Sequence, residues 1–186
     1  MISTRCWKRA LVLLGSLWML GVLVACGAFD PAMTENEPGE MGFQQVESQY
    51  EKWMAMEVTG PPQDQVEALE QKLDTFEELD AAYEQLTEDA APYWEAAARF
   101  RRGDIYQYMA DFLLTEVPVP YQEGTEEYWT YRDLLDDVAF PLEDHAVCKF
   151  EELHGWSQHQ GVVNDWTDRG ARRLEILKQH GAGCGD

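Results

Sequence analysis

The apolar residues of this chain recur every three or four positions, and this spacing constrains the fold more than any other feature of the sequence. The clearest run begins near Asp64 and has Glu, Gln and Asp over almost all of its opposite face. Its apolar stripe consists of Val66, Leu69, Leu73, Phe76, Leu79, Tyr83 and Leu86. Such a stripe predicts an amphipathic α-helix packed on a core. No stretch alternates as a strand does, so the predicted class is all-α, as an antiparallel helical bundle or a short array of helix hairpins.

Proline and glycine set the expected ends of the neighbouring helices. Apolar residues follow helical spacing from Phe43 to Val58. The tandem prolines of Gly60-Pro61-Pro62 end that helix, because they remove backbone donors and bias the preceding residue away from helical angles. A later helix starts near Pro92, since proline is tolerated in a first turn, and runs to about Leu114.

Two more helices are expected in the last third of the chain. Thr125 is a plausible N-cap for the first of them, which ends at His154-Gly155. Pro141 lies inside this segment, so we expect the helix to be kinked or divided there. Asn164 can cap the last helix, and Gly181 is a natural C-terminal cap for it.

The N-terminus has the pattern of an export signal. Arg5, Lys8 and Arg9 precede the apolar stretch 11–24, which is shorter than the roughly 20 apolar residues that a membrane-spanning helix needs. The stretch ends in Leu23-Val24-Ala25-Cys26, which resembles the lipobox of bacterial lipoproteins. The resemblance implies cleavage before Cys26 and acylation of that cysteine, and several acyl chains give stable anchoring. A secreted protein with a chance cysteine at its cleavage site is the alternative.

The lipobox implies a division of the chain and a location. Residues 1–25 form the predicted signal peptide, 26–42 the lipidated cysteine and a flexible tether, 43–181 the helical domain and 182–186 a C-terminal tail. Because Gly27 and not Asp follows the cysteine, the resemblance favours the periplasmic face of the outer membrane. The outer leaflet of the cytoplasmic membrane is the alternative.

Net charge narrows the class of partner. The chain has 35 acidic and 14 basic residues and a formal net charge of -21. Nucleic acid and anionic headgroups are therefore not expected as partners, because phosphate binding needs clustered cations. Arg99, Arg101 and Arg102 form a basic cluster, which we interpret as a solvated stripe or an internal salt-bridge set, with a docking site for an acidic group as the alternative.

Cys148 and Cys184 are the cysteines that remain after the export signal and the lipobox. Two such thiols in an oxidising compartment are usually paired. If the last two helices form a hairpin that turns near residue 159, residues 178–180 lie beside 138–140, about 12–15 Å along the axis from Cys148. The four residues of the tail span up to about 13 Å when extended. A disulfide, free thiols and an intermolecular link therefore all stay open.

Short segments suggest a known type of helical array. The step from Gly103 to Tyr106, and Ala146 with Phe150, resemble fragments of the tetratricopeptide helix-turn-helix pattern. With the final segment 164–167, they are similar to divergent tetratricopeptide-like exported proteins of myxobacteria and related bacteria. The resemblance implies a short helix-hairpin array that serves as a scaffold in an envelope assembly.

The sequence indicates no catalytic site. His145, Cys148, His154 and His159 are the one cluster with metal-binding side chains, and they lack the paired spacing of structural zinc sites. We therefore expect no metal, no cofactor and no enzymatic activity. The predicted function is a membrane-anchored, periplasmic protein-protein interaction scaffold that binds an envelope protein of unknown identity. The alternative is a lipoprotein that binds a small apolar or glycan ligand in a pocket between helices.

Overall fold

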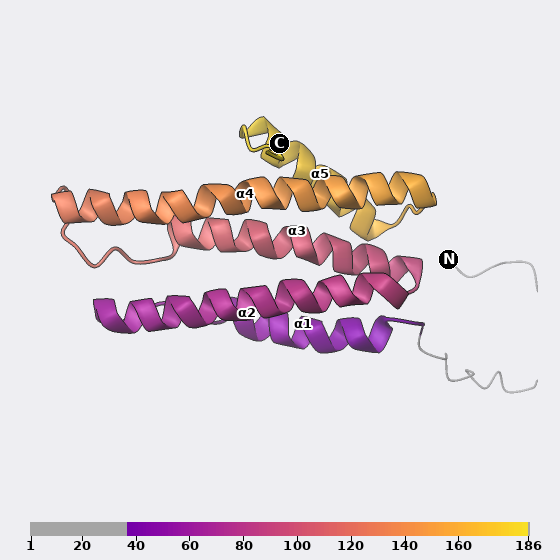
Figure 1. Ribbon diagram of the computed structural model, residues 1–186, viewed down its shortest axis with the longest axis horizontal. Helices are drawn as coiled ribbons and strands as arrows, with labels where there is room; N and C mark the ends of the chain where they lie inside the picture. The colour runs from indigo at the N-terminus through magenta and orange to yellow at the C-terminus, as the bar shows by residue number, and fades with distance from the viewer. Residues whose placement is uncertain (1–36, 186) are drawn as a thin grey trace, which may run out of the picture. The chain divides into compact units, whose positions relative to one another are not determined.

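The computed structural model describes residues 37–185, and these residues form α-helices with no strand. The all-α prediction is therefore confirmed. The helices are α1 (Glu40–Met54), α2 (Pro62–Asp89), α3 (Pro92–Thr115), α4 (Glu126–Gln160) and α5 (Asp165–Gln179) (Figure 1). The predicted signal peptide, Cys26 and the tether up to residue 36 lie outside the described residues.

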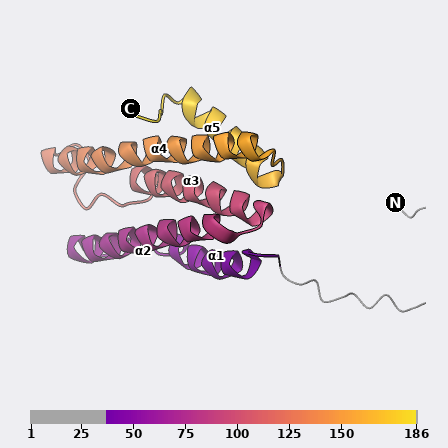
Figure 2. The same cartoon turned by 45° about the vertical axis from the view of Figure 1, so that its right-hand side comes forward.

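Consecutive helices run in opposite directions, so that α1, α3 and α5 run one way and α2 and α4 the other (Figures 1 and 2). Helix α3 is central, because it packs against all four other helices. Helix α1 packs on α2 and α3, and α5 packs on α4 and α3. The arrangement is a short array of helix hairpins in which α1 and α5 both border α3.

The first two helices begin earlier than their apolar spacing indicates. Helix α1 starts at Glu40 and ends at Met54, so the expected bounds, Phe43 and Val58, are each displaced toward the N-terminus. Residues 40–42 of the predicted tether are therefore helical, because a first turn needs no buried side chain. Helix α2 starts at Pro62, since proline fits the first helical position.

One prediction for α4 is wrong. The helix is continuous through Pro141, and it does not end at His154-Gly155 but continues to Gln160. Gly161 ends it instead, because this glycine adopts a left-handed conformation with φ 67° and the amide of Val162 donates to the carbonyl of Ser157 at 3.0 Å. The predicted N-cap is confirmed, since the Thr125 hydroxyl accepts from the amide of Tyr128.

Both predicted ends of α5 are confirmed. The Asn164 side chain accepts from the amides of Trp166 and Thr167, and the Thr167 hydroxyl accepts in return from the Asn164 amide. At the other end, Gly181 has φ 91°, and the amide of Ala182 donates to the carbonyl of Leu177. This is the Schellman arrangement that satisfies the last carbonyls of a helix.

The described residues hold two hydrophobic clusters. The larger one joins α1, α2, α3 and the first half of α4, around Trp53, Tyr83 and Ile105. The smaller one joins the second half of α4 to α5 and to Phe100 of α3. Helices α3 and α4 approach closely beside it, because a Cβ atom on Gly103 would lie 2.6 Å from the ring of Phe150.

Candidate functional site

A cleft of about 510 Å³ opens between α1, α3 and α5. Helix α3 provides its floor, and α1 and α5 provide its two walls. The cleft is lined by Tyr50, Met54, Phe100, Arg101, Asp104, Gln107, Tyr108, Asp111, Arg169, Arg172, Arg173 and Ile176. Its size falls within the range of small-molecule sites, about 300–1,000 Å³. Four arginines gathered in one place are unexpected in a chain of such negative charge.

Helix α5 contributes three arginines and one isoleucine from a single face. Arg169, Arg172, Arg173 and Ile176 follow the i, i+3, i+4, i+7 spacing that aligns side chains on one side of a helix. The adjacent face buries Leu174 and Leu177 in the smaller cluster. The same amphipathic pattern that fixes α5 to the domain therefore directs these arginines toward the cleft.

The three α5 arginines have no carboxylate within 4.0 Å among residues 37–185. By contrast, Arg99, Arg101, Arg102, Arg132, Lys149 and Lys178 each pair with a carboxylate. Arg173 acts on one carboxylate of the cleft, because its charge opposes the effect of burial on the pKa of Asp111. Burial raises the pKa of Asp111, and no ion pair joins this carboxylate to Arg173 within residues 37–185.

The cleft floor carries a partly buried ionic network. Arg101 donates through Nη2 and Nε to the Glu47 carboxylate at 2.7 and 2.8 Å, and through Nη1 to Asp104 at 2.7 Å. The Tyr50 hydroxyl donates to Asp104 at 3.1 Å, and the Tyr83 hydroxyl donates to Glu47 at 2.6 Å. Burial, with help from the neighbouring carboxylates, raises the pKa of both tyrosines. Arg101 is therefore shared between Glu47 and Asp104, whereas the α5 arginines have no ion-pair partner within residues 37–185.

One end of the cleft is closed by aromatic side chains. Trp166 of α5 contacts the ring of Phe43 on α1, with centroids 5.9 Å apart. The guanidinium groups of Arg101 and Arg169 lie 5.6 and 4.9 Å from the Trp166 ring, and Arg101 also lies 4.5 Å from the Tyr50 ring. These cation-π contacts order the closed end. The free arginines Arg172 and Arg173 lie toward the other end, since they come later in α5.

The basic cluster found in the sequence is an internal salt-bridge set. Arg99 pairs with Glu95 within α3, and Arg102 pairs with Asp80 and Glu84 of α2. Their charges are already matched, so the docking site proposed for them as an alternative has no free cation. The free arginines instead belong to α5, which the sequence analysis did not single out.

Sequence reasoning also missed a buried lysine. The side chain of Lys72 is 0% exposed, and its Nζ donates to the carbonyls of Trp53 and Met56 at 3.1 and 2.8 Å. The indole of Trp53 donates back to the Lys72 carbonyl at 2.9 Å, and Nζ lies 4.1 Å from the Phe112 ring. Burial lowers the pKa of Lys72 to about 8, opposed by Glu116. The sequence did contain a signal for its burial, because Lys72 lies four residues before Phe76 and so falls on the buried stripe of the helix.

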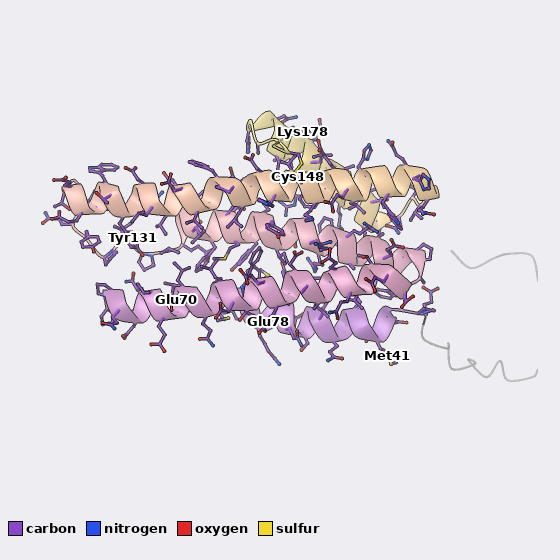
Figure 3. All side chains as sticks on the ribbon, viewed as in Figure 1. Met41, Glu70, Glu78, Tyr131, Cys148 and Lys178 are labelled. Carbon is purple, nitrogen blue, oxygen red and sulfur yellow. A yellow bond between two sulfur atoms is a disulfide. The ribbon has the colours of Figure 1, made fainter. Side chains whose placement is uncertain are left out.

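The predicted cysteine pair lies together. Cys148 of α4 and Cys184 of the tail form a disulfide, and the Gly183 amide donates to Asp144 at 3.0 Å. The expected hairpin geometry was wrong, because Lys178 pairs with Glu151 and therefore lies beside the part of α4 that holds Cys148, not beside 138–140. Figure 3 labels Lys178 and Cys148 in this region. The turn lies between α4 and α5 at 161–164, later than residue 159, which shifts the pairing of the two helices.

The histidines of the predicted cluster make local contacts. The Nδ1 atom of His145 lies 2.6 Å from the Pro141 carbonyl, and its ring stacks on Tyr106. His154 contacts Gln158, and Cys148 is held in the disulfide. Within residues 37–185, no three His, Cys, Asp or Glu side chains are arranged to hold a metal ion.

Comparison with known proteins adds no assignment. No family model matches the chain, no curated protein matches it, and no solved structure matches it. Among the described residues, no helix is long and apolar enough to cross a bilayer. The function must therefore be argued from the cleft itself.

Proposed function

We propose that this chain is a helical protein-interaction domain whose α1/α3/α5 cleft binds a segment of a partner protein in the cell envelope. The observation that supports this most is the combination of unpaired arginines on α5 with the apolar wall of Tyr50, Met54 and Tyr108. Tyrosine and arginine are enriched at the centres of protein interfaces. A cleft that runs across three helices suits an extended segment.

The proposal places the domain at a membrane through Cys26. Lipidation of Cys26 rests on the lipobox resemblance of residues 23–26, which lie outside the described residues. The periplasmic face of the outer membrane is the proposed location, and the outer leaflet of the cytoplasmic membrane is the alternative. A Cys26→Ala variant should leave the membrane fraction and label poorly with a palmitate analogue. Continued membrane fractionation of this variant would contradict the anchor.

A small ligand is the second candidate for the cleft. Its volume of about 510 Å³ supports this candidate, as do the aromatic rings of Tyr108 and Phe100 among polar groups. An apolar or glycan ligand would stack on such rings. Crosslinking in the cell distinguishes the two candidates. A photoreactive residue in the cleft would capture a protein if a partner segment binds there, and would capture none if a small ligand binds.

Site-specific photo-crosslinking tests the proposal. A photoreactive residue is placed at Gln107 in the cleft, and a matched one at Gln71, an exposed position on α2. We expect Gln107 to give a reproducible crosslink to one envelope protein and Gln71 to give none. If neither position captures a protein while a lipid or glycan is carried through purification, the small-ligand candidate replaces the proposal. Equal crosslinking from Gln107 and Gln71 would indicate nonspecific contact with the surface and would contradict binding in the cleft.

A further inference from the structure

We infer that the segment bound in the cleft is acidic and extended, with two carboxylate side chains flanking one apolar side chain. This inference rests on the proposed function, because it names the chemistry of the partner at that same site. It is carried by charge complementarity between the cleft and its occupant. The unpaired α5 arginines favour acidic side chains, their spacing favours an extended segment, and the wall that faces them favours an apolar side chain.

The α5 arginines favour a negative partner. Arg169, Arg172 and Arg173 are exposed and unpaired within the described residues, whereas the cleft carboxylate Asp104 is already bound to Arg101. The remaining carboxylate of the cleft, Asp111, forms no ion pair with these arginines within the described residues. Guanidinium groups bind carboxylates through paired hydrogen bonds, and this favours an occupant with Asp or Glu side chains.

Their spacing fits an extended chain. Arg169 and Arg173 are four residues apart on α5, which separates their Cα atoms by about 6 Å along the helix axis at 1.5 Å per residue. In an extended strand, residues i and i+2 point to the same side and are about 6.6 Å apart. Two carboxylates at alternate positions of an extended segment would therefore meet the two ends of the arginine stripe.

The opposite wall selects the residue between them. In an extended segment, the side chain at i+1 points away from those at i and i+2. It would point toward the α1 side of the cleft, where Tyr50, Met54 and Tyr108 present aromatic and thioether surface. An apolar or aromatic side chain at this position buries area against these groups. The favoured sequence is thus acidic, apolar, acidic.

A direct titration tests the inference. The full-length protein in detergent is titrated into a fluorescently labelled peptide with a central Glu-Phe-Glu flanked by glycine and serine, and anisotropy is recorded. A matched peptide carries Lys-Phe-Lys instead. We expect the acidic probe to bind at least about tenfold more tightly, since like charges oppose the lysine probe. We also expect its affinity to fall severalfold between about 50 and 300 mM salt.

Variants locate the binding to α5. Arg172→Gln with Arg173→Gln should weaken the acidic probe at least about tenfold, because each lost charge pair costs part of the binding energy. Lys52→Gln with Lys149→Gln removes the same charge outside the cleft and should change affinity less than about twofold. Both α5 arginines are exposed, so circular dichroism should show an unchanged fold.

Two results would overturn the inference. One is equal binding of the acidic and lysine probes, and the other is equal binding of the acidic probe to both double variants. The failure of the proposed function gives a different result, because no protein would then crosslink at Gln107. A crosslinked partner segment that lacks Asp and Glu would leave the proposed function standing and reject this inference alone.

Discussion

Helices α1 and α5 have the same length, 15 residues each, and border the same cleft, yet they are held to the domain by different means. Helix α1 sends Trp53 and Phe43 into the larger cluster, and its last turn is fixed by the buried Lys72. Helix α5 buries Leu174 and Leu177 in the smaller cluster and is followed by the disulfide-bound tail. One wall of the cleft is therefore part of the larger cluster, and the other packs on the smaller cluster and is followed by a crosslink.

This difference predicts which wall of the cleft can be altered without unfolding the domain. Changes in the α1 wall should act on global stability, because α1 shares its core with α2 and α3. Changes in the α5 wall should act locally, since fewer buried side chains hold it. Local opening of weakly held elements is common in proteins and is measurable by hydrogen exchange.

The largest effect is expected from the α1 anchor. Trp53→Ala removes a side chain that is 0% exposed and leaves the Lys72 carbonyl without its indole donor. We expect a loss of about 3–5 kcal/mol in the free energy of unfolding, measured with denaturant. Trp129→Ala, at a position 55% exposed, is the control and should cost less than about 0.5 kcal/mol. Equal losses would show that α1 is not an anchor.

The next effect comes from the disulfide. Cys184→Ser removes the disulfide between two cysteines that are 36 residues apart in the sequence. We expect the free energy of unfolding to fall by about 2–4 kcal/mol. Hydrogen exchange should rise in α5 while the amides of α1 to α3 stay protected. Uniform loss of protection across all helices would contradict the distinction between the two walls. A reducing agent applied to the unmodified protein should reproduce the pattern.

The buried lysine predicts an unusual pH dependence. The folded-state pKa of Lys72 is about 8, below the unfolded value of about 10.4, so between these values the unfolded state binds more protons. Stability should therefore rise from pH 8 to 9.5, by up to about 2 kcal/mol. The predicted rise in stability ends at about pH 9.5 because of the buried tyrosines. Above about pH 10 the unfolded chain loses its tyrosine protons while the raised pKa values of Tyr50 and Tyr83 keep them protonated in the fold, so stability falls. Lys72→Met should lack the rise, and a parallel rise in this variant would contradict the assignment.

The smallest effect concerns the cap of α5. Asn164→Ala removes the acceptor for the amides of Trp166 and Thr167, and we expect a loss of about 1 kcal/mol. Thermal unfolding followed by circular dichroism measures it. Exchange should increase first in the opening turn of α5, near Trp166 at the closed end of the cleft. An unchanged melting temperature together with unchanged exchange would show that packing alone holds this turn.

Local chemistry made several elements predictable from sequence. Thr125 and Asn164 were identified as caps because their side chains satisfy the first amides of a helix, and this needs no tertiary information. The end of α4 was not predictable in the same way, because Gly155 and Gly161 both favour termination. Packing of the second half of α4 on α3 and α5 selects the later glycine.

The cleft itself needed tertiary information. Charges at the spacing of Arg169, Arg172 and Arg173 are typical of any solvated helix face, and only the placement of α5 beside α3 brings them to a cleft. Lys72 was missed for the opposite reason, because a lysine among acidic residues suggests an exposed position. Its alignment with Phe76 and Leu79 on the buried stripe was the available signal.

Isoleucine methyl NMR tests the central claim, the binding role of the cleft, most directly. The chain has three isoleucines: Ile2, Ile105 in the buried core, and Ile176, which is 44% exposed in the cleft. On titration with the Glu-Phe-Glu probe, we expect the Ile176 methyl signals to shift saturably while those of Ile105 stay in place; Ile2 lies in the predicted signal peptide and gives no signal after cleavage. Unmoved Ile176 signals at probe concentrations that saturate anisotropy would place binding elsewhere and contradict the account.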